Sequence, residues 1–121
     1  MSRHELEAFV GRWLAAWTGN KPERLLGFYA QDATYRDPAR PAGLQGHEQL
    51  RPYFVRLLGA NPQWVWEPLE VAPTPRGCCL KWKATVPQPS GTIEWVGLDL
   101  VEIDGGLITR NEVYFDPQPR G

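Results

Sequence analysis

Two aspartates stand out in this sequence because their surroundings suit acid–base chemistry. Asp99 lies in the middle of the apolar segment Trp95–Val101, where an unpaired carboxylate is costly to bury. Asp37 lies much earlier in the chain, directly before Pro38. Two separated carboxyls among many aromatic residues predict a small enclosed site in which acid and base roles are divided between them.

Each aspartate also has a purely structural interpretation. Asp99 can lie on a solvent-facing or dimer-facing sheet surface, or pair with Lys81 or Lys83 across strands. Asp-Pro is common in turns, because aspartate bonds its own backbone and proline fixes the next residue. Along its strand, however, Asp99 has mainly apolar neighbours on either face, so we expect desolvation to raise its pKa.

Three helices are predicted in the first half of the chain. Ser2 and Glu5 fit a capping box, and apolar residues then recur at spacings of three and four until about Thr18. A short second helix begins at Pro22, a favoured first helical residue. The third spans residues 47–58 and is closed by Gly59. Between them, residues 30–46 are turn-rich, with a short strand at 33–36.

The second half predicts four strands, at residues 63–71, 77–86, 92–103 and 107–115. Turn residues at 87–91 and 104–106 connect them as hairpins. The order favours an α+β domain, with the helices covering one face of a curved antiparallel or mixed sheet around a pocket. The proline-rich end, residues 117–121, is expected to be frayed.

Composition excludes several classes of function. With 121 residues, a net charge of -1 and no basic run, the chain carries no electrostatic signature of nucleic acid or membrane binding. Its first residues lack a basic segment followed by an apolar one, so we expect no secretory signal, and no apolar stretch approaches the ~20 residues that span a bilayer. A disulfide between the adjacent residues Cys78 and Cys79 could not link distant parts of the fold. This favours a location in the reducing cytoplasm. We expect no metal, because neither His4 nor His47 has partners at ligand spacing, and no cofactor, because no phosphate-binding loop is present.

Aromatic residues are the natural lining of an apolar pocket. Six tryptophans in 121 residues are unusual, although core packing explains most of them. On the last strand Asn111 shares the parity of Val113 and Phe115, whereas Arg110 and Glu112 share the other and are expected to be solvated or dimer-facing. The substrate-binding residues predicted are Trp13, Trp17, Tyr29, Phe54, Trp82, Asn111 and Phe115.

Several runs along the chain resemble one superfamily of proteins. The segment from Phe28 to Pro38, the helix start Gly46–Leu50 and the apolar-Asp-apolar stretch Leu98–Leu100 are similar to ketosteroid isomerase. The ending Glu112–Asp116 resembles SnoaL-like polyketide cyclases. Both belong to the nuclear transport factor 2-like superfamily. The resemblance implies that residues 1–121 form one domain of this kind, a cone-shaped α+β fold with a pocket.

The resemblance also implies roles. Asp37 matches the general base of the isomerase, and Asp99 matches the protonated acid that donates a hydrogen bond to the substrate oxyanion. Tyr29 matches a tyrosine that hydrogen-bonds this donor. Trp13 stands where the catalytic tyrosine is expected, and an indole is a far weaker acid than a phenol. Homodimerisation through the sheet is implied as well.

Three functions follow from these features. The first is cofactor-free isomerisation or aldol-type cyclisation of an apolar carbonyl compound, carried by Asp37 and Asp99. The second is non-catalytic binding of an apolar small molecule. The third is a structural or interaction role through the outer sheet face. The residues alone do not decide whether the protein is an enzyme.

Overall fold

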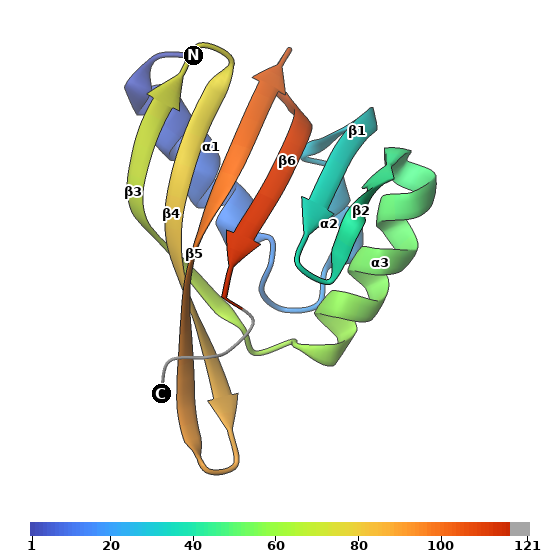
Figure 1. Ribbon diagram of the computed structural model, residues 1–121, viewed down its shortest axis with the longest axis vertical. Helices are drawn as coiled ribbons and strands as arrows, with labels where there is room; N and C mark the ends of the chain where they lie inside the picture. Colours follow the sequence, from blue (N-terminus) through green and yellow to red (C-terminus); the bar gives the residue numbers. More distant parts are fainter. Residues whose placement is uncertain (117–121) are drawn as a thin grey trace.

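A computed structural model describes residues 1–116 of the chain, so the predicted fraying of 117–121 lies outside the described residues. Three helices and six strands follow one another along the chain (Figure 1). Their order is α1 (Arg3–Ala15), α2 (Pro22–Leu26), β1 (Tyr29–Asp37), β2 (Arg40–Gln45), α3 (Gly46–Ala60), β3 (Val65–Thr74), β4 (Gly77–Gln88), β5 (Gly91–Asp104) and β6 (Leu107–Phe115).

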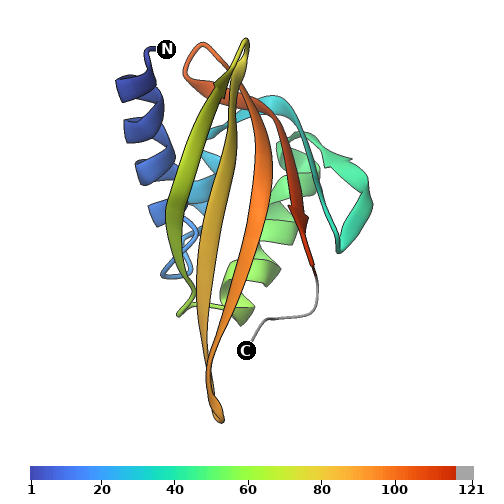
Figure 2. The same ribbon diagram turned by 60° about the vertical axis from the view of Figure 1, so that its left-hand side comes forward.

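The strands form one mixed sheet in the order β2-β1-β6-β5-β4-β3. Only β1 and β6 run parallel, and the other neighbouring pairs are antiparallel. The sheet is strongly twisted and does not close, and Figure 2 shows α1 and α3 behind the same face of it. The predicted α+β architecture, a curved sheet covered by helices on one face, is confirmed.

The helix starts follow the sequence signals closely. Ser2 and Glu5 form the predicted capping box: the Ser2 hydroxyl accepts from the Glu5 N–H at 3.1 Å, and the Glu5 carboxylate accepts from the Ser2 N–H at 3.0 Å. The helix ends at Ala15, three residues before the predicted end. Gly19 and Asn20 both have positive φ, 89° and 53°, so the chain reverses there before α2 begins at Pro22.

The region predicted as turn-rich contains more sheet than expected. The short strand predicted at 33–36 is the end of β1, which starts at Tyr29, and β2 was not predicted at all. β2 is an edge strand, so Pro41 is tolerated there without a backbone donor. The tight turn between the two strands is held by Asp37, whose carboxylate accepts from the N–H groups of Ala39 and Arg40.

The core lies between the helices and the concave face of the sheet. On β5 the residues of the Asp99 parity, Gly97, Asp99 and Val101, are buried, whereas Val96 and Leu98 are exposed. Asp99 therefore faces the helices. No helix among residues 1–116 is long and apolar enough to cross a membrane.

Candidate functional site

Asp37 and Asp99 line the same cavity, between the helices and the sheet. The cavity has a volume of about 120 Å³. Helices α1 and α3 and strands of the sheet contribute to its wall. Seven of the lining side chains are aromatic. The complete lining is Leu14, Trp17, Tyr35, Asp37, Ala39, Tyr53, Leu57, Trp64, Trp66, Trp82, Asp99, Val113 and Phe115.

The Asp37 carboxylate is held by four donors. Its Oδ2 accepts from the hydroxyls of Tyr35 at 2.7 Å and Tyr53 at 2.5 Å. Its Oδ1 accepts from the backbone N–H groups of Ala39 and Arg40, both at 2.9 Å. A carboxylate offers about four lone-pair positions, so these bonds occupy all of them. The carboxyl group is therefore fully hydrogen-bonded, although only 7% of the residue is exposed.

Asp99 has only two donors. Its Oδ1 accepts from the indole N–H of Trp82 at 2.7 Å, and its Oδ2 accepts from the side-chain amide of Asn111 at 3.0 Å. Two of its lone-pair positions are thus without a bond from the described residues. Burial raises the pKa of Asp99 from 3.8 to about 7; the bonds from Asn111 and Trp82 oppose this rise, and the charge of Asp37 adds to it. The expected rise is confirmed, and Asp99 forms no pair with Lys81 or Lys83.

A buried chain of hydrogen bonds runs from Asp99 on β5 through Asn111 on β6 to Tyr29 on β1. Asn111 donates to Asp99 and accepts at its Oδ1 from the Tyr29 hydroxyl at 2.8 Å. Asn111 therefore stands between Tyr29 and Asp99, where the resemblance implied a direct bond. Burial raises the pKa of Tyr29 well above its usual range, so this hydroxyl stays protonated and fixes the amide orientation.

The predicted substrate-binding residues fall into two groups. Trp17, Trp82 and Phe115 line the cavity. Four others are fully buried behind its wall and are absent from the lining: Trp13, Tyr29, Phe54 and Asn111. The Trp13 ring packs edge-on against Tyr29, with centroids 6.5 Å apart. Its N–H has no acceptor among residues 1–116.

Sequence reasoning missed four aromatic residues of the wall: Tyr35, Tyr53, Trp64 and Trp66. Two of them, Tyr35 and Tyr53, could have been predicted from the sequence pattern. Tyr35 lies two residues from Asp37 on the same strand face, and Tyr53 belongs to the apolar face of α3. That both hydroxyls converge on one carboxylate oxygen depends on how α3 packs against β1, which no local pattern reveals.

A second aromatic groove adjoins the cavity. It measures about 180 Å³ and shares Trp64, Trp66, Trp82 and Phe115 with the cavity, and Ala84 and Trp95 complete it. No charged side chain is among its lining residues. The cavity and the groove thus share part of an aromatic wall, and carboxyl groups line the cavity but not the groove.

The structure offers no metal centre in the residues it describes: no group of three histidine, cysteine or acidic side chains is close enough together. His47 instead contacts the backbone oxygen of Tyr29 through Nε2 at 2.8 Å. Cys78 is buried and Cys79 half-buried, and both are free thiols.

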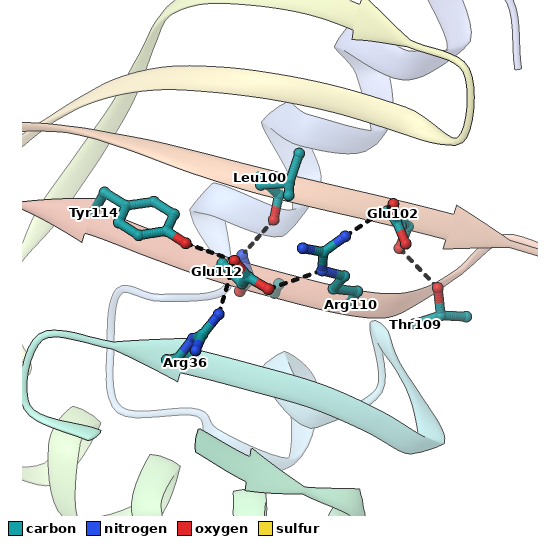
Figure 3. A network of polar contacts seen from close by, with 8 residues as sticks. Arg36, Leu100, Glu102, Thr109, Arg110, Glu112 and Tyr114 are labelled. Carbon is teal, nitrogen blue, oxygen red and sulfur yellow. Dashed lines mark hydrogen bonds and ion pairs between the residues drawn. The ribbon is translucent and has the colours of Figure 1, made fainter. Parts of the chain in front are cut away.

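A polar network covers the outer face of β5 and β6 (Figure 3). At its centre the Glu112 carboxylate accepts from Tyr114 at 2.6 Å and Arg110 at 2.8 Å, and Arg36 lies 3.2 Å away. Arg110 also reaches Glu102 at 3.3 Å. The bonds from Tyr114 and Arg110 lower the pKa of Glu112 to about 2. The predicted outward pairing of Arg110 with Glu112 is confirmed.

Solved structures share this fold at low sequence identity. A Catenulispora acidiphila protein with a ketosteroid isomerase-like fold, solved with trimethylamine, is 22% identical, with a TM-score of 0.79 over 90% of this chain and 85% of that one. The epoxide hydrolase/cyclase-like enzyme SalBIII of salinomycin pyran ring formation is 15% identical, with a TM-score of 0.80 over 96% and 94%. A Mycobacterium tuberculosis protein solved with estradiol-17beta-hemisuccinate is 18% identical, with a TM-score of 0.74 over 93% and 94%.

No curated protein matches the sequence. The model of one protein family does match, over residues 10–111, and its description is "SnoaL-like domain". This range contains both aspartates of the cavity and all six strands except the end of β6. The chain therefore belongs to the SnoaL-like domain family, with a nuclear transport factor 2-like fold.

Proposed function

We propose that this protein acts on an apolar carbonyl compound by cofactor-free acid–base chemistry, either double-bond isomerisation or aldol-type cyclisation. One observation carries the proposal: two buried carboxyls with unequal hydrogen bonding line one aromatic cavity. Pairs of titratable groups with contrasting environments divide acid and base roles. A carboxyl with a pKa near 7 is also well matched to proton transfer at neutral pH.

The hydrogen bonds favour Asp99 as the group that exchanges the proton. All four lone-pair positions of Asp37 are occupied, whereas Asp99 keeps two. Asp37 then acts as a fixed negative charge that positions the Tyr35 and Tyr53 hydroxyls at the cavity wall. Either hydroxyl can turn from Asp37 to donate to a developing oxyanion.

In this scheme the Asp99 carboxylate removes a proton from the carbon next to the substrate carbonyl. The electron pair of the broken C–H bond forms an enolate, whose oxygen accepts a hydrogen bond from Tyr35 or Tyr53. For a β,γ-unsaturated ketone, Asp99 returns the proton to the γ-carbon, and the product is the conjugated isomer. For cyclisation, the enolate carbon instead attacks a second carbonyl, and the new alkoxide takes back the proton that Asp99 removed.

The resemblance to ketosteroid isomerase assigns the roles the other way, with Asp37 as base and protonated Asp99 as hydrogen-bond donor. The pH dependence of turnover separates the two schemes. If Asp99 is the base, kcat/KM rises with pH through about 7, because the carboxylate form is needed. If Asp99 is the donor, kcat/KM falls through the same range, because the protonated form is needed.

The volume of the cavity limits the reacting group. The cavity measures about 120 Å³. Pockets for drug-sized ligands measure roughly 300–1,000 Å³. A small ketone, or the end of a longer molecule that extends into the adjoining groove, fits better than a complete steroid.

Non-catalytic binding of an apolar ligand is the second candidate, favoured by the aromatic lining shared between cavity and groove. It predicts binding without turnover. Structures of the same fold hold ligands as different as trimethylamine and a steroid ester, which supports a small-molecule role of either kind.

We further infer a homodimer through the outer face of the sheet. Val96, Leu98 and Tyr114 are each about half exposed there. Leu98 is the register partner of Tyr114, which also belongs to the polar network of Figure 3. Exposed apolar residues grouped on one face are typical of an interface. A cytoplasmic location stays a prediction.

The test is the conversion of cyclohex-3-en-1-one to its conjugated isomer, followed by absorbance. Native protein should turn it over, and Asp99→Asn should reduce kcat/KM by about 10²-fold or more. Tight binding of the ketone with no turnover by native protein would instead support the binding function.

A further inference from the structure

We propose that the cavity also binds small organic ammonium ions, namely tertiary or quaternary alkylammonium groups. This inference goes beyond the proposed carbonyl chemistry and does not require turnover of any substrate. It follows from three properties of the cavity: its aromatic wall, its buried negative charge and its size.

The wall is built largely from aromatic rings. Trp17, Trp64, Trp66, Trp82, Tyr35, Tyr53 and Phe115 all line the cavity. Several of these rings pack against one another. The Trp66 ring centroid lies 4.7 Å from that of Trp82 and 5.6 Å from that of Trp17. Aromatic cages of this kind recognise quaternary ammonium groups, because the negative faces of the rings attract a cation that carries no hydrogen-bond donor.

The charge inside the cavity is unbalanced. Asp37 and Asp99 are 7% and 4% exposed, and no lysine, arginine or histidine is among the lining residues that the structure describes. The Arg40 guanidinium lies 5.2 Å from the Tyr53 ring centroid, yet Arg40 itself is exposed and absent from the lining. A buried carboxylate gains most from a cation that shares its desolvated site, and an ammonium ligand supplies one.

The size of the cavity selects a compact cation. At about 120 Å³ the cavity is well below the roughly 300–1,000 Å³ of pockets for drug-sized ligands. A trimethylammonium head, one nitrogen with three methyl groups, is a compact cation of the kind that such a small cavity favours. Any longer substituent has the aromatic groove beside Trp95 available to it.

The charge of Asp99 should change the affinity of the cavity for an ammonium ion. Near Asp99 lie Asp37 and Tyr29 of β1 and Cys78 of β4. Burial keeps both Tyr29 and Cys78 protonated at neutral pH, since it raises the pKa of Tyr29 far above its usual range and that of Cys78 to about 11. The charge of Asp99 changes between pH 6 and pH 8, because burial raises its pKa to about 7, and a cation should bind more tightly at pH 8.

The experiment compares choline with 3,3-dimethylbutan-1-ol, which replaces the charged nitrogen by carbon at nearly the same shape. Binding is measured by calorimetry and by tryptophan fluorescence at pH 6 and pH 8. We expect choline to bind at least about tenfold more tightly than the alcohol at pH 8, in line with a desolvated cation–π contact. The preference should shrink at pH 6, and in Asp99→Asn it should lose its pH dependence.

A pair of tryptophan variants checks that the cavity is the binding site. Trp66→Leu removes a ring from the cavity wall and should weaken choline binding severalfold more than binding of the alcohol. Trp95→Leu removes a ring that lines only the groove and should leave the choline preference intact. Urea unfolding confirms that each variant is folded.

Equal binding of the alcohol and choline by native protein would overturn the inference. So would a choline preference that survives both Asp99→Asn and Trp66→Leu. Ketone turnover is measured separately from choline binding. Absence of turnover would therefore not affect the binding result, and absence of choline binding would not affect the turnover result.

Discussion

Trp82 and Gly97 face each other across β4 and β5, and the missing side chain at position 97 leaves the space that the indole occupies. The two residues are register partners. A Cβ at Gly97 would lie 2.7 Å from Cη2 of Trp82 and 2.8 Å from the Tyr114 carbonyl oxygen, closer than real Cβ atoms approach. The indole that Gly97 accommodates donates to Asp99 at 2.7 Å, so this glycine positions a site residue.

Gly97→Ala should therefore destabilise the fold and disturb the site. We expect the free energy of unfolding in urea to fall by about 1–3 kcal/mol, as in other overpacked cores. Displacement of the Trp82 indole should also change the tryptophan fluorescence spectrum of the folded state.

Gly11→Ala is the matched control for this substitution. Gly11 lies within α1, and a Cβ there would meet no atom within 4 Å. Because alanine has a higher helix propensity than glycine, the free energy of unfolding of the Gly11→Ala variant should rise by up to about 1 kcal/mol. Gly97→Ala as stable as the native protein would contradict the proposed positioning role.

The two tyrosines at Asp37 should each contribute to stability. Tyr53→Phe or Tyr35→Phe removes one donor from a buried carboxylate, and the loss of a hydrogen bond to a charged group costs about 1.5–3 kcal/mol. Tyr114→Phe removes a similar bond, to Glu112, on an exposed residue, and should cost less stability than either of the other two substitutions. Equal losses for all three variants in urea unfolding would refute the buried carboxylate cluster as a source of stability.

Asp99 should make stability depend on pH in a direction opposite to most acids. Its pKa is 3.8 in an unfolded chain and about 7 in the fold, so the native state keeps a proton that the unfolded state releases. Stability should therefore fall as pH rises from about 4 to 7, by up to roughly 4 kcal/mol.

Unfolding in urea at several pH values measures this effect. The difference in stability between native protein and Asp99→Asn should change across pH 4–7 and stay constant above it. A difference independent of pH would show that Asp99 is charged in the fold throughout.

The outer face of the sheet should hold the dimer together. Leu98→Asp places a charge at a 46% exposed position on β5 and should give a monomer in sedimentation analysis. Leu69→Asp, at a 50% exposed position on the edge strand β3, is the control and should leave the dimer unchanged. A native protein that is monomeric at all concentrations would contradict the proposed homodimer.

The sequence predicted most of the fold because its signals were local. The Ser2–Glu5 capping box, Pro22 and the alternation on the last four strands each act within a few residues. β2 escaped prediction because it is a short edge strand with a proline and a glycine, and it owes its place to pairing with β1.

The candidate site was predicted only in part for the same reason. Alternation along β5 gave Asp99 mainly apolar neighbours on either face, but only the structure shows that it points inward. The bond from Tyr53 to Asp37, the position of Asn111 between Tyr29 and Asp99, and the contact of Gly97 with Trp82 all join residues on different elements. Such relationships depend on strand register and helix packing, which a single sequence does not reveal.

The most direct test of the central claim is the pH profile of cyclohex-3-en-1-one isomerisation from pH 5 to pH 9. It should be measured for native protein, Asp37→Asn and Asp99→Asn. The account predicts that native kcat/KM rises through about pH 7 and that Asp99→Asn loses both the activity and this inflection. Asp37→Asn should lower the rate without moving the inflection far. Native turnover that Asp99→Asn retains in full, with the same profile, would contradict the account.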